Sequence, residues 1–108
     1  MQQIQQIAVN NNGGYVMSFS VQWLDSSGQW NTSKWNSGNY PIDQTVTSPE
    51  LGTIGVPTDA LAVTPYVHAV WGDNAQGTPF VSYVSGSGTV ATYTASGTTL
   101  SVHVTLNQ

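Results

Sequence analysis

The chain has 108 residues, enough for one domain with one modest core, and residues 1–108 are predicted to form a single domain. Lys34 is its only basic residue against five acidic ones, and the formal net charge of -4 excludes nucleic acid as a main partner and disfavours anionic lipid surfaces. Cysteine is absent, which excludes disulfides, thiolate catalysis and Cys-based metal sites.

The first half of the chain predicts β-structure, because short alternating runs of apolar and polar residues are separated by Gly, Asn, Ser and Pro. The clearest strand covers residues 14–24. Its apolar face carries Tyr15, Met17, Phe19, Val21 and Trp23. Ile7 and Val9 alternate before the turn cluster at residues 10–14, so we expect the first two strands to form an antiparallel hairpin.

Two further segments follow. Residues 42–51 alternate weakly and end at a Ser-Pro pair, whereas residues 61–71 read as a strand with Val67, Ala69 and Trp71 on one face. Pro65 should mark an edge or a bulge of that strand. Continuation of the apolar alternation predicts that Trp23 and Trp71 both belong to the core.

The last third predicts a meander over residues 78–106. A hairpin loop at residues 96–97 would place Tyr93 opposite Leu100, with both side chains on the inward face. About seven or eight strands in one domain are typical of an all-β antiparallel sandwich or Greek-key barrel. We therefore predict a single-domain β-sandwich, with the barrel as the alternative.

The least regular long stretch, residues 25–40, sets aromatic residues among amides and hydroxyls with almost no charge. An indole or phenol ring stacks on the apolar face of a sugar, and amides pair with its hydroxyls. The loop after residue 71 adds similar polar groups. The predicted ligand-binding residues are Trp30, Asn31, Trp35, Asn36, Asn39, Tyr40, Asp73 and Asn74. Trp30 and Trp35 have a second interpretation, as lids that complete a small core.

Catalytic groups have no recognisable pattern in the sequence. The five carboxylates are scattered, His68 and His103 have no neighbouring nucleophile motif, and no Gly-x-Ser-x-Gly elbow occurs. One Asp in a Gly-rich turn offers too few oxygens for calcium. We therefore expect no enzyme activity, no catalytic residues, no metal and no cofactor.

These observations favour a non-catalytic carbohydrate-binding protein, a lectin that recognises neutral sugars. The scarcity of charge leaves edge strands unprotected, so we expect a homo-oligomer whose copies bind multivalently. The main alternative is a membrane-binding or pore-forming, cytolysin-like β protein, in which the loop aromatics anchor in lipid. A self-assembling structural protein is a third hypothesis. The N-terminus resembles no signal peptide, so we expect cytoplasmic synthesis, with any release by a non-classical route.

Overall fold

A computed structural model describes residues 1–107, so residue 108 of the predicted domain lies outside the described part. The described residues form ten strands and one 3-10 helix, η1 (Leu51–Ile54). The strands are β1 (Gln3–Ile4), β2 (Gln6–Asn11), β3 (Met17–Leu24), β4 (Trp30–Thr32), β5 (Thr45–Thr47), β6 (Ala62–Ala69), β7 (Asn74–Gln76), β8 (Ser82–Tyr83), β9 (Val90–Thr98) and β10 (Ser101–Leu106).

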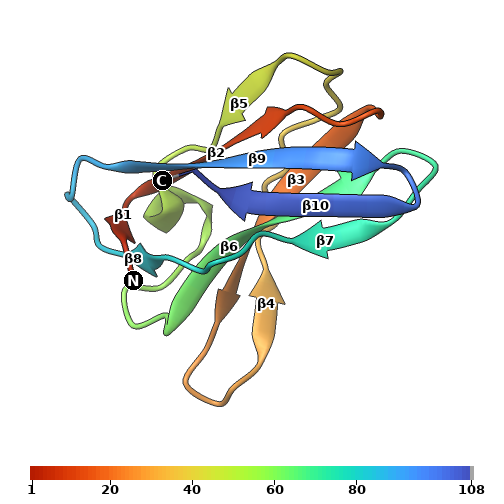
Figure 1. Ribbon diagram of the computed structural model, residues 1–108. Coiled ribbons are helices and arrows are strands. Elements are labelled where there is room, and N and C mark those ends of the chain that lie inside the picture. Colours follow the sequence, from red (N-terminus) through yellow and green to blue (C-terminus); the bar gives the residue numbers. More distant parts are fainter. Residues whose placement is uncertain (108) are drawn as a thin grey trace.

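Two four-stranded sheets form the body of the molecule. One has the order β10-β9-β2-β5 and the other the order β4-β3-β6-β7, while β1 and β8 pair separately. In Figure 1 the long strands β9 and β10 lie across the steeper β3 and β6 behind them. The prediction of an all-β sandwich is confirmed.

The core lies between the two sheets and follows the alternation of the strands. Met17, Phe19 and Val21 of β3 are fully buried and face inward, as their spacing predicts. Tyr93 is the largest fully buried side chain, and its hydroxyl donates to the Pro79 carbonyl oxygen (2.6 Å). Burial raises the pKa of Tyr93 to about 12, so this phenol stays neutral and serves as a donor.

Strand pairing differs from the prediction at the N-terminus. β2 and β3 belong to different sheets, so the predicted hairpin between the first two strands is wrong. β2 instead runs parallel to β9, with Ile7 opposite Ala91, and antiparallel to β5. These pairings join segments that are far apart in the sequence, and local alternation carries no information about them.

The C-terminal meander is correct only for its last hairpin. β8 pairs with β1 rather than with β9, and β9 meets β10 through a turn at Thr99 and Leu100. Tyr93 therefore lies opposite Leu106, six residues later than the predicted partner Leu100.

Pro65 lies inside β6, where Val21 of β3 is its partner. Its carbonyl oxygen accepts a hydrogen bond from the Gly77 amide (2.9 Å), one residue after β7 ends. The amide and carbonyl of a residue in an antiparallel strand point to the same neighbouring strand, so the N–H that Pro65 lacks would also have faced Gly77. Because β7 has already ended there, the missing donor interrupts no further pairing between β6 and β7.

Three connections gather at one end of the sandwich: the β2–β3, β6–β7 and β9–β10 loops. Figure 1 shows the β6–β7 and β9–β10 loops on the right, while both chain termini lie on the left. The end that carries these loops is therefore remote from the termini.

Candidate functional site

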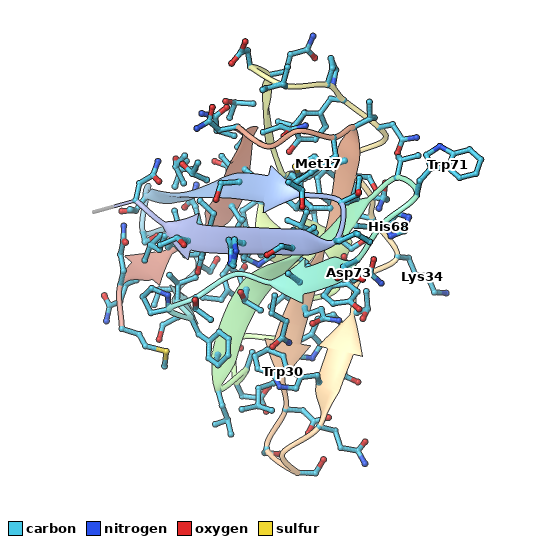
Figure 2. The ribbon with its side chains drawn as sticks, turned by 45° about the vertical axis from the view of Figure 1, so that its right-hand side comes forward. Met17, Trp30, Lys34, His68, Trp71 and Asp73 are labelled. Carbon is cyan, nitrogen blue, oxygen red and sulfur yellow. The ribbon has the colours of Figure 1, made fainter. Side chains whose placement is uncertain are left out.

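Two large apolar side chains project from this loop end into water. Trp71, in the β6–β7 loop, is 95% exposed, and Leu100, in the β9–β10 loop, is 81% exposed. In Figure 2 the indole of Trp71 points away from the body of the molecule. The prediction that Trp71 belongs to the core is wrong, because β6 ends at Ala69 and the alternation ends with it.

The backbone around Trp71 holds the side chain outward. The Gly72 amide donates to the Ala69 carbonyl oxygen (3.0 Å), which closes a four-residue turn with Trp71 in its third position. Trp71 has a φ of 65°, a left-handed conformation that favours glycine or asparagine over a bulky residue. Such strain costs about 1–3 kcal/mol and is concentrated at functional sites.

The three loops are tied to one another by backbone hydrogen bonds. Asp73 donates its amide to the Thr99 carbonyl oxygen (2.8 Å), and Val70 donates to Val16 (2.9 Å). Gly72 has no side chain, and a Cβ there would lie 2.7 Å from Thr99 Cβ. Val16, on the β2–β3 loop, is 41% exposed. We call Val16, Trp71 and Leu100 the apolar tip.

Buried polar contacts brace the β2–β3 loop beneath the apolar tip. The fully buried Asn11 donates through Nδ2 to the Tyr15 carbonyl oxygen (2.8 Å), and its Oδ1 accepts from the Gly13 amide (3.0 Å). The Tyr15 hydroxyl donates to the Ser96 carbonyl oxygen of β9 (2.8 Å), in the same sheet as β2. These contacts anchor the loop to the β10-β9-β2-β5 sheet.

Polar side chains flank the apolar tip. Asp73 is exposed beside Trp71, His68 Nδ1 contacts Asn74 Oδ1, and Ser101 Oγ lies 3.1 Å from His103 Nε2. Among residues 1–107 no group of three or more His, Asp or Glu side chains is arranged to hold a metal ion. No helix within the same residues has the length and apolar character needed to cross a membrane.

The residues predicted to bind sugar are spread along β3 rather than gathered. Trp30 pairs opposite Leu24 at one end of the strand, and Tyr40 is bridged to Met17 at the other. Seven residues of strand separate these positions by roughly 23 Å. Asp73 lies in the β6–β7 loop, and Asn74 is the first residue of β7.

The predicted aromatic residues are also engaged in the fold. Trp35 packs edge-to-face on Phe19, with ring centroids 5.3 Å apart, and Trp30 packs in the same way on Phe80 at 5.0 Å. Tyr40 is only 4% exposed, and its hydroxyl donates to a β2 carbonyl oxygen (2.8 Å). All three rings are thus partly or wholly covered by neighbouring side chains.

The predicted amides differ in their engagement. Asn31 Nδ2 donates to Asp25 Oδ2 (2.8 Å), and Asn36 Nδ2 donates to Ser20 Oγ (3.1 Å), whereas Asn39 is exposed. Hydrogen bonds to Asp25, chiefly from the Ser27 hydroxyl and then from Asn31, lower the pKa of its carboxyl to about 2. The amide of Asn31 therefore has a committed anionic partner within the loop.

Comparison with solved structures identifies similar folds in toxins. A structure described as a trapped toxin matches with a TM-score of 0.52 and 15% identity over 95% of this chain, and a Gram-negative toxin matches with a TM-score of 0.50 and 17% identity over 95%. The membrane-binding domain of pneumolysin matches with a TM-score of 0.49 and 15% identity over 96% of both chains. This chain spans 23% and 22% of the first two toxin chains. At these identities the likeness concerns the fold. No protein-family model matches, and no curated protein matches by sequence.

Sequence reasoning missed the apolar tip, although a signal for Trp71 was present. Gly72, Asp73 and Asn74 follow Trp71 directly and are typical of a turn. Such a run indicates that the strand ends before Trp71, which then lies in the turn. Leu100 offered no such signal, because it was assigned to a strand through the wrong hairpin turn.

Proposed function

We propose that this chain is a membrane-binding module that attaches to a bilayer surface through the apolar tip. The observation that carries the proposal is the exposure of Trp71 and Leu100 on two loops joined by the hydrogen bond from Asp73 to Thr99. Exposing a large indole to water is unfavourable. A rigid apolar projection at one end of a domain is suited to insertion into the apolar part of a bilayer.

The chemistry of the side chains fits the bilayer interface. Indole rings concentrate at the level of the lipid headgroups, and leucine adds apolar area that reaches the acyl boundary. Because both loops are fixed to the sandwich, insertion requires little ordering of the protein, which lowers the entropic cost of binding.

The charge of the protein selects the type of surface. The net charge is -4, and Asp73 lies exposed beside Trp71. Polybasic segments attract proteins to anionic leaflets, and this chain has only Lys34. We therefore expect binding to neutral, zwitterionic lipid, weakening as anionic lipid is added.

The fold likeness to two toxins, at TM-scores of 0.52 and 0.50, is in line with this proposal. One matching structure is itself described as a membrane-binding domain. The present chain corresponds to less than a quarter of the toxin chains. The proposed role is accordingly surface attachment without catalysis, with self-association of the bound copies as a further part of the proposal.

The experiment is vesicle flotation with phosphatidylcholine alone and with phosphatidylcholine plus phosphatidylserine. We expect the wild type to float with neutral vesicles, and Trp71→Ser and Leu100→Ser each to reduce the floating fraction. Leu61→Ser is the matched control, because Leu61 is 51% exposed and lies beside Leu24, at the opposite end of β3 from Met17.

Two outcomes would count against membrane attachment through the apolar tip. One is flotation of the Trp71→Ser, Leu100→Ser double variant at the level of the wild type. The other is binding of the wild type only to vesicles that carry a neutral glycolipid, unaffected by both substitutions, which would favour the sugar-binding hypothesis. Cross-linking of the floated fraction reports whether the bound copies associate.

A further inference from the structure

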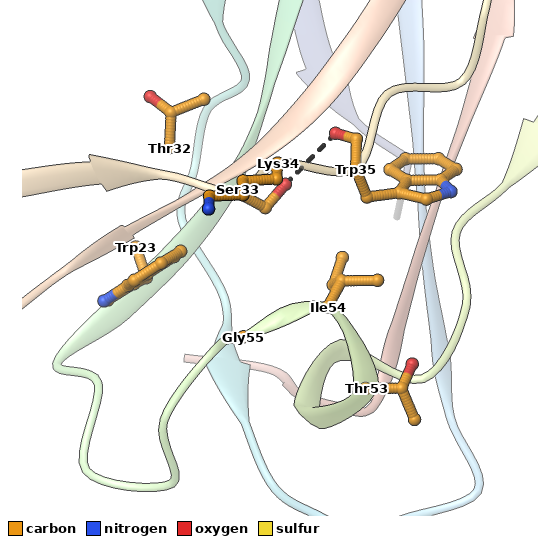
Figure 3. A pocket seen from close by; sticks show the side chains of 8 residues that line it. All are labelled: Trp23, Thr32, Ser33, Lys34, Trp35, Thr53, Ile54 and Gly55. Carbon is orange, nitrogen blue, oxygen red and sulfur yellow. Dashed lines mark hydrogen bonds between the residues drawn. The ribbon is translucent and has the colours of Figure 1, made fainter.

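A pocket of about 580 Å³ is lined by none of the residues of the apolar tip. The segment that follows β4 forms one wall, and η1 with its C-terminal Gly55 forms the other (Figure 3). Its volume falls within the range of small-molecule sites. The lining residues are Trp23, Thr32, Ser33, Lys34, Trp35, Thr53, Ile54 and Gly55.

The apolar part of the lining is built into the core and is therefore fixed. Trp23, Trp35 and Ile54 are half-buried and pack against core residues while facing the pocket. The edge-to-face contact of Trp35 with Phe19 holds its indole in place. A preformed apolar wall of this kind binds a ligand without first having to order itself.

The hydroxyl groups of the lining already have partners in the protein. Ser33 Oγ accepts from the Val21 amide (3.3 Å) and donates to the Trp35 carbonyl oxygen (3.2 Å). Thr53 Oγ1 donates to the backbone of residue 50 (2.6 Å), and Thr32 Oγ1 accepts from Gln22 Nε2 (3.1 Å). A sugar, which needs several paired donors and acceptors, would find few free groups here.

Lys34 supplies the only full charge in the lining. It is the only Lys or Arg in the whole sequence, it is exposed, and within residues 1–107 no acidic side chain forms an ion pair with it. Its flexible stem carries three rotatable donors that can follow a ligand at the rim of the pocket. In a protein with a net charge of -4, this ammonium is the one Lys or Arg charge that can attract an anion.

We propose that this pocket binds a small amphipathic anion, an apolar carboxylate of the fatty-acid type. The hydrocarbon part packs against Trp23, Trp35 and Ile54, and the carboxylate accepts a charge-assisted hydrogen bond from Lys34. This site is independent of membrane attachment, because it shares no residue with the apolar tip.

The test is titration with decanoate, kept below its micelle concentration, followed by tryptophan fluorescence and calorimetry. Trp71→Ser serves as the host protein, because it removes the solvent-exposed indole and leaves Trp30 and the two tryptophans that line the pocket. We expect saturable binding, and about a tenfold or greater loss of affinity in Lys34→Gln, since one charge-assisted hydrogen bond contributes on that scale.

Three matched controls make the test specific. Lys34→Arg should restore most of the affinity, decanol should bind Lys34→Gln and the host equally, and acetate should not bind. Absence of saturable decanoate binding, or equal affinity of the host and Lys34→Gln for decanoate, would overturn the assignment. Because the host lacks Trp71, either result is independent of vesicle flotation.

Discussion

Substitution of Trp71 by asparagine distinguishes what the indole contributes to vesicle binding from what it contributes to the stability of the fold. Burial of an indole removes on the order of 200 Å² from water, and at about 25 cal/mol/Å² complete transfer contributes ~5 kcal/mol. The interface is only partly dehydrated, so we take about half of that value. We therefore expect Trp71→Asn to weaken binding to neutral vesicles by ~60-fold.

The same substitution should raise the stability of the folded chain or leave it unchanged. Trp71 is 95% exposed, so its removal forfeits almost no packing. Its φ of 65° suits asparagine better than tryptophan, and relief of this strain contributes up to about 1 kcal/mol. For a domain of this size that gain raises the melting temperature by up to about 4 °C.

The assay pairs thermal unfolding in free solution with flotation on neutral vesicles for the same preparation. The reasoning predicts unchanged or higher stability together with lost binding. A fall in stability of more than about 1 kcal/mol would mean that the indole packs on the protein in solution. Undiminished vesicle affinity would mean that Trp71 is not the anchor.

Three further predictions concern the supports of the fold. Gly72→Val should lower stability by about 1–3 kcal/mol and weaken vesicle binding, because its Cβ would collide with Thr99 and push the loops apart; unfolding and flotation measure both effects. Tyr40→Phe should cost about 1–2 kcal/mol in urea unfolding, because the buried Val9 carbonyl oxygen loses a donor; no change would show that water replaces the hydroxyl. Hydrogen bonds, chiefly from a tyrosine hydroxyl, hold the pKa of Glu50 in the folded protein below its usual range. The Glu50 carboxylate therefore contributes to stability above its unfolded pKa of about 4.3. This contribution is lost as the pH falls through the lower pKa of the folded state. In Glu50→Gln the melting temperature should therefore depend less on pH between about 5 and 3, and an identical pH profile would contradict this.

Much of the fold could be predicted from side-chain alternation alone. The inward face of β3 is correct from Met17 to Val21, and the inward residues Val67 and Ala69 of β6 are fully buried as predicted. Alternation succeeds at these residues because one face of each strand packs on the core.

Register could not be predicted with the same rule. The predicted partner of Tyr93 was Leu100, and the observed partner is Leu106. A shift by an even number of residues leaves every side chain on its predicted face, so the hydrophobic pattern fits both registers equally well. The turn then decides the register, and the Ser-Gly pair at residues 96–97 was a stronger local turn signal than Thr99 and Leu100.

The candidate site escaped prediction for a related reason. Aromatic residues in the polar segment 25–40 suggested exposure, yet Trp35 and Trp30 pack on Phe19 and Phe80, which come from other elements. Trp71, at the end of an apolar run, suggested burial, yet the strand stops two residues earlier. Whether an aromatic ring is covered depends on long-range packing, which a local pattern does not encode.

Trp71 is unfavourable for the isolated chain in two independent ways. Its indole is left in water, and its backbone occupies a conformation that glycine or asparagine would adopt without strain. Either feature alone could be incidental. A residue that lowers the stability of the fold through both its side chain and its backbone is best explained by a gain in binding free energy when the protein meets a partner. Insertion of the loop end into a bilayer would provide that gain. Leu100 would be inserted in the same step as Trp71, because the hydrogen bond from Asp73 to Thr99 holds the two loops together.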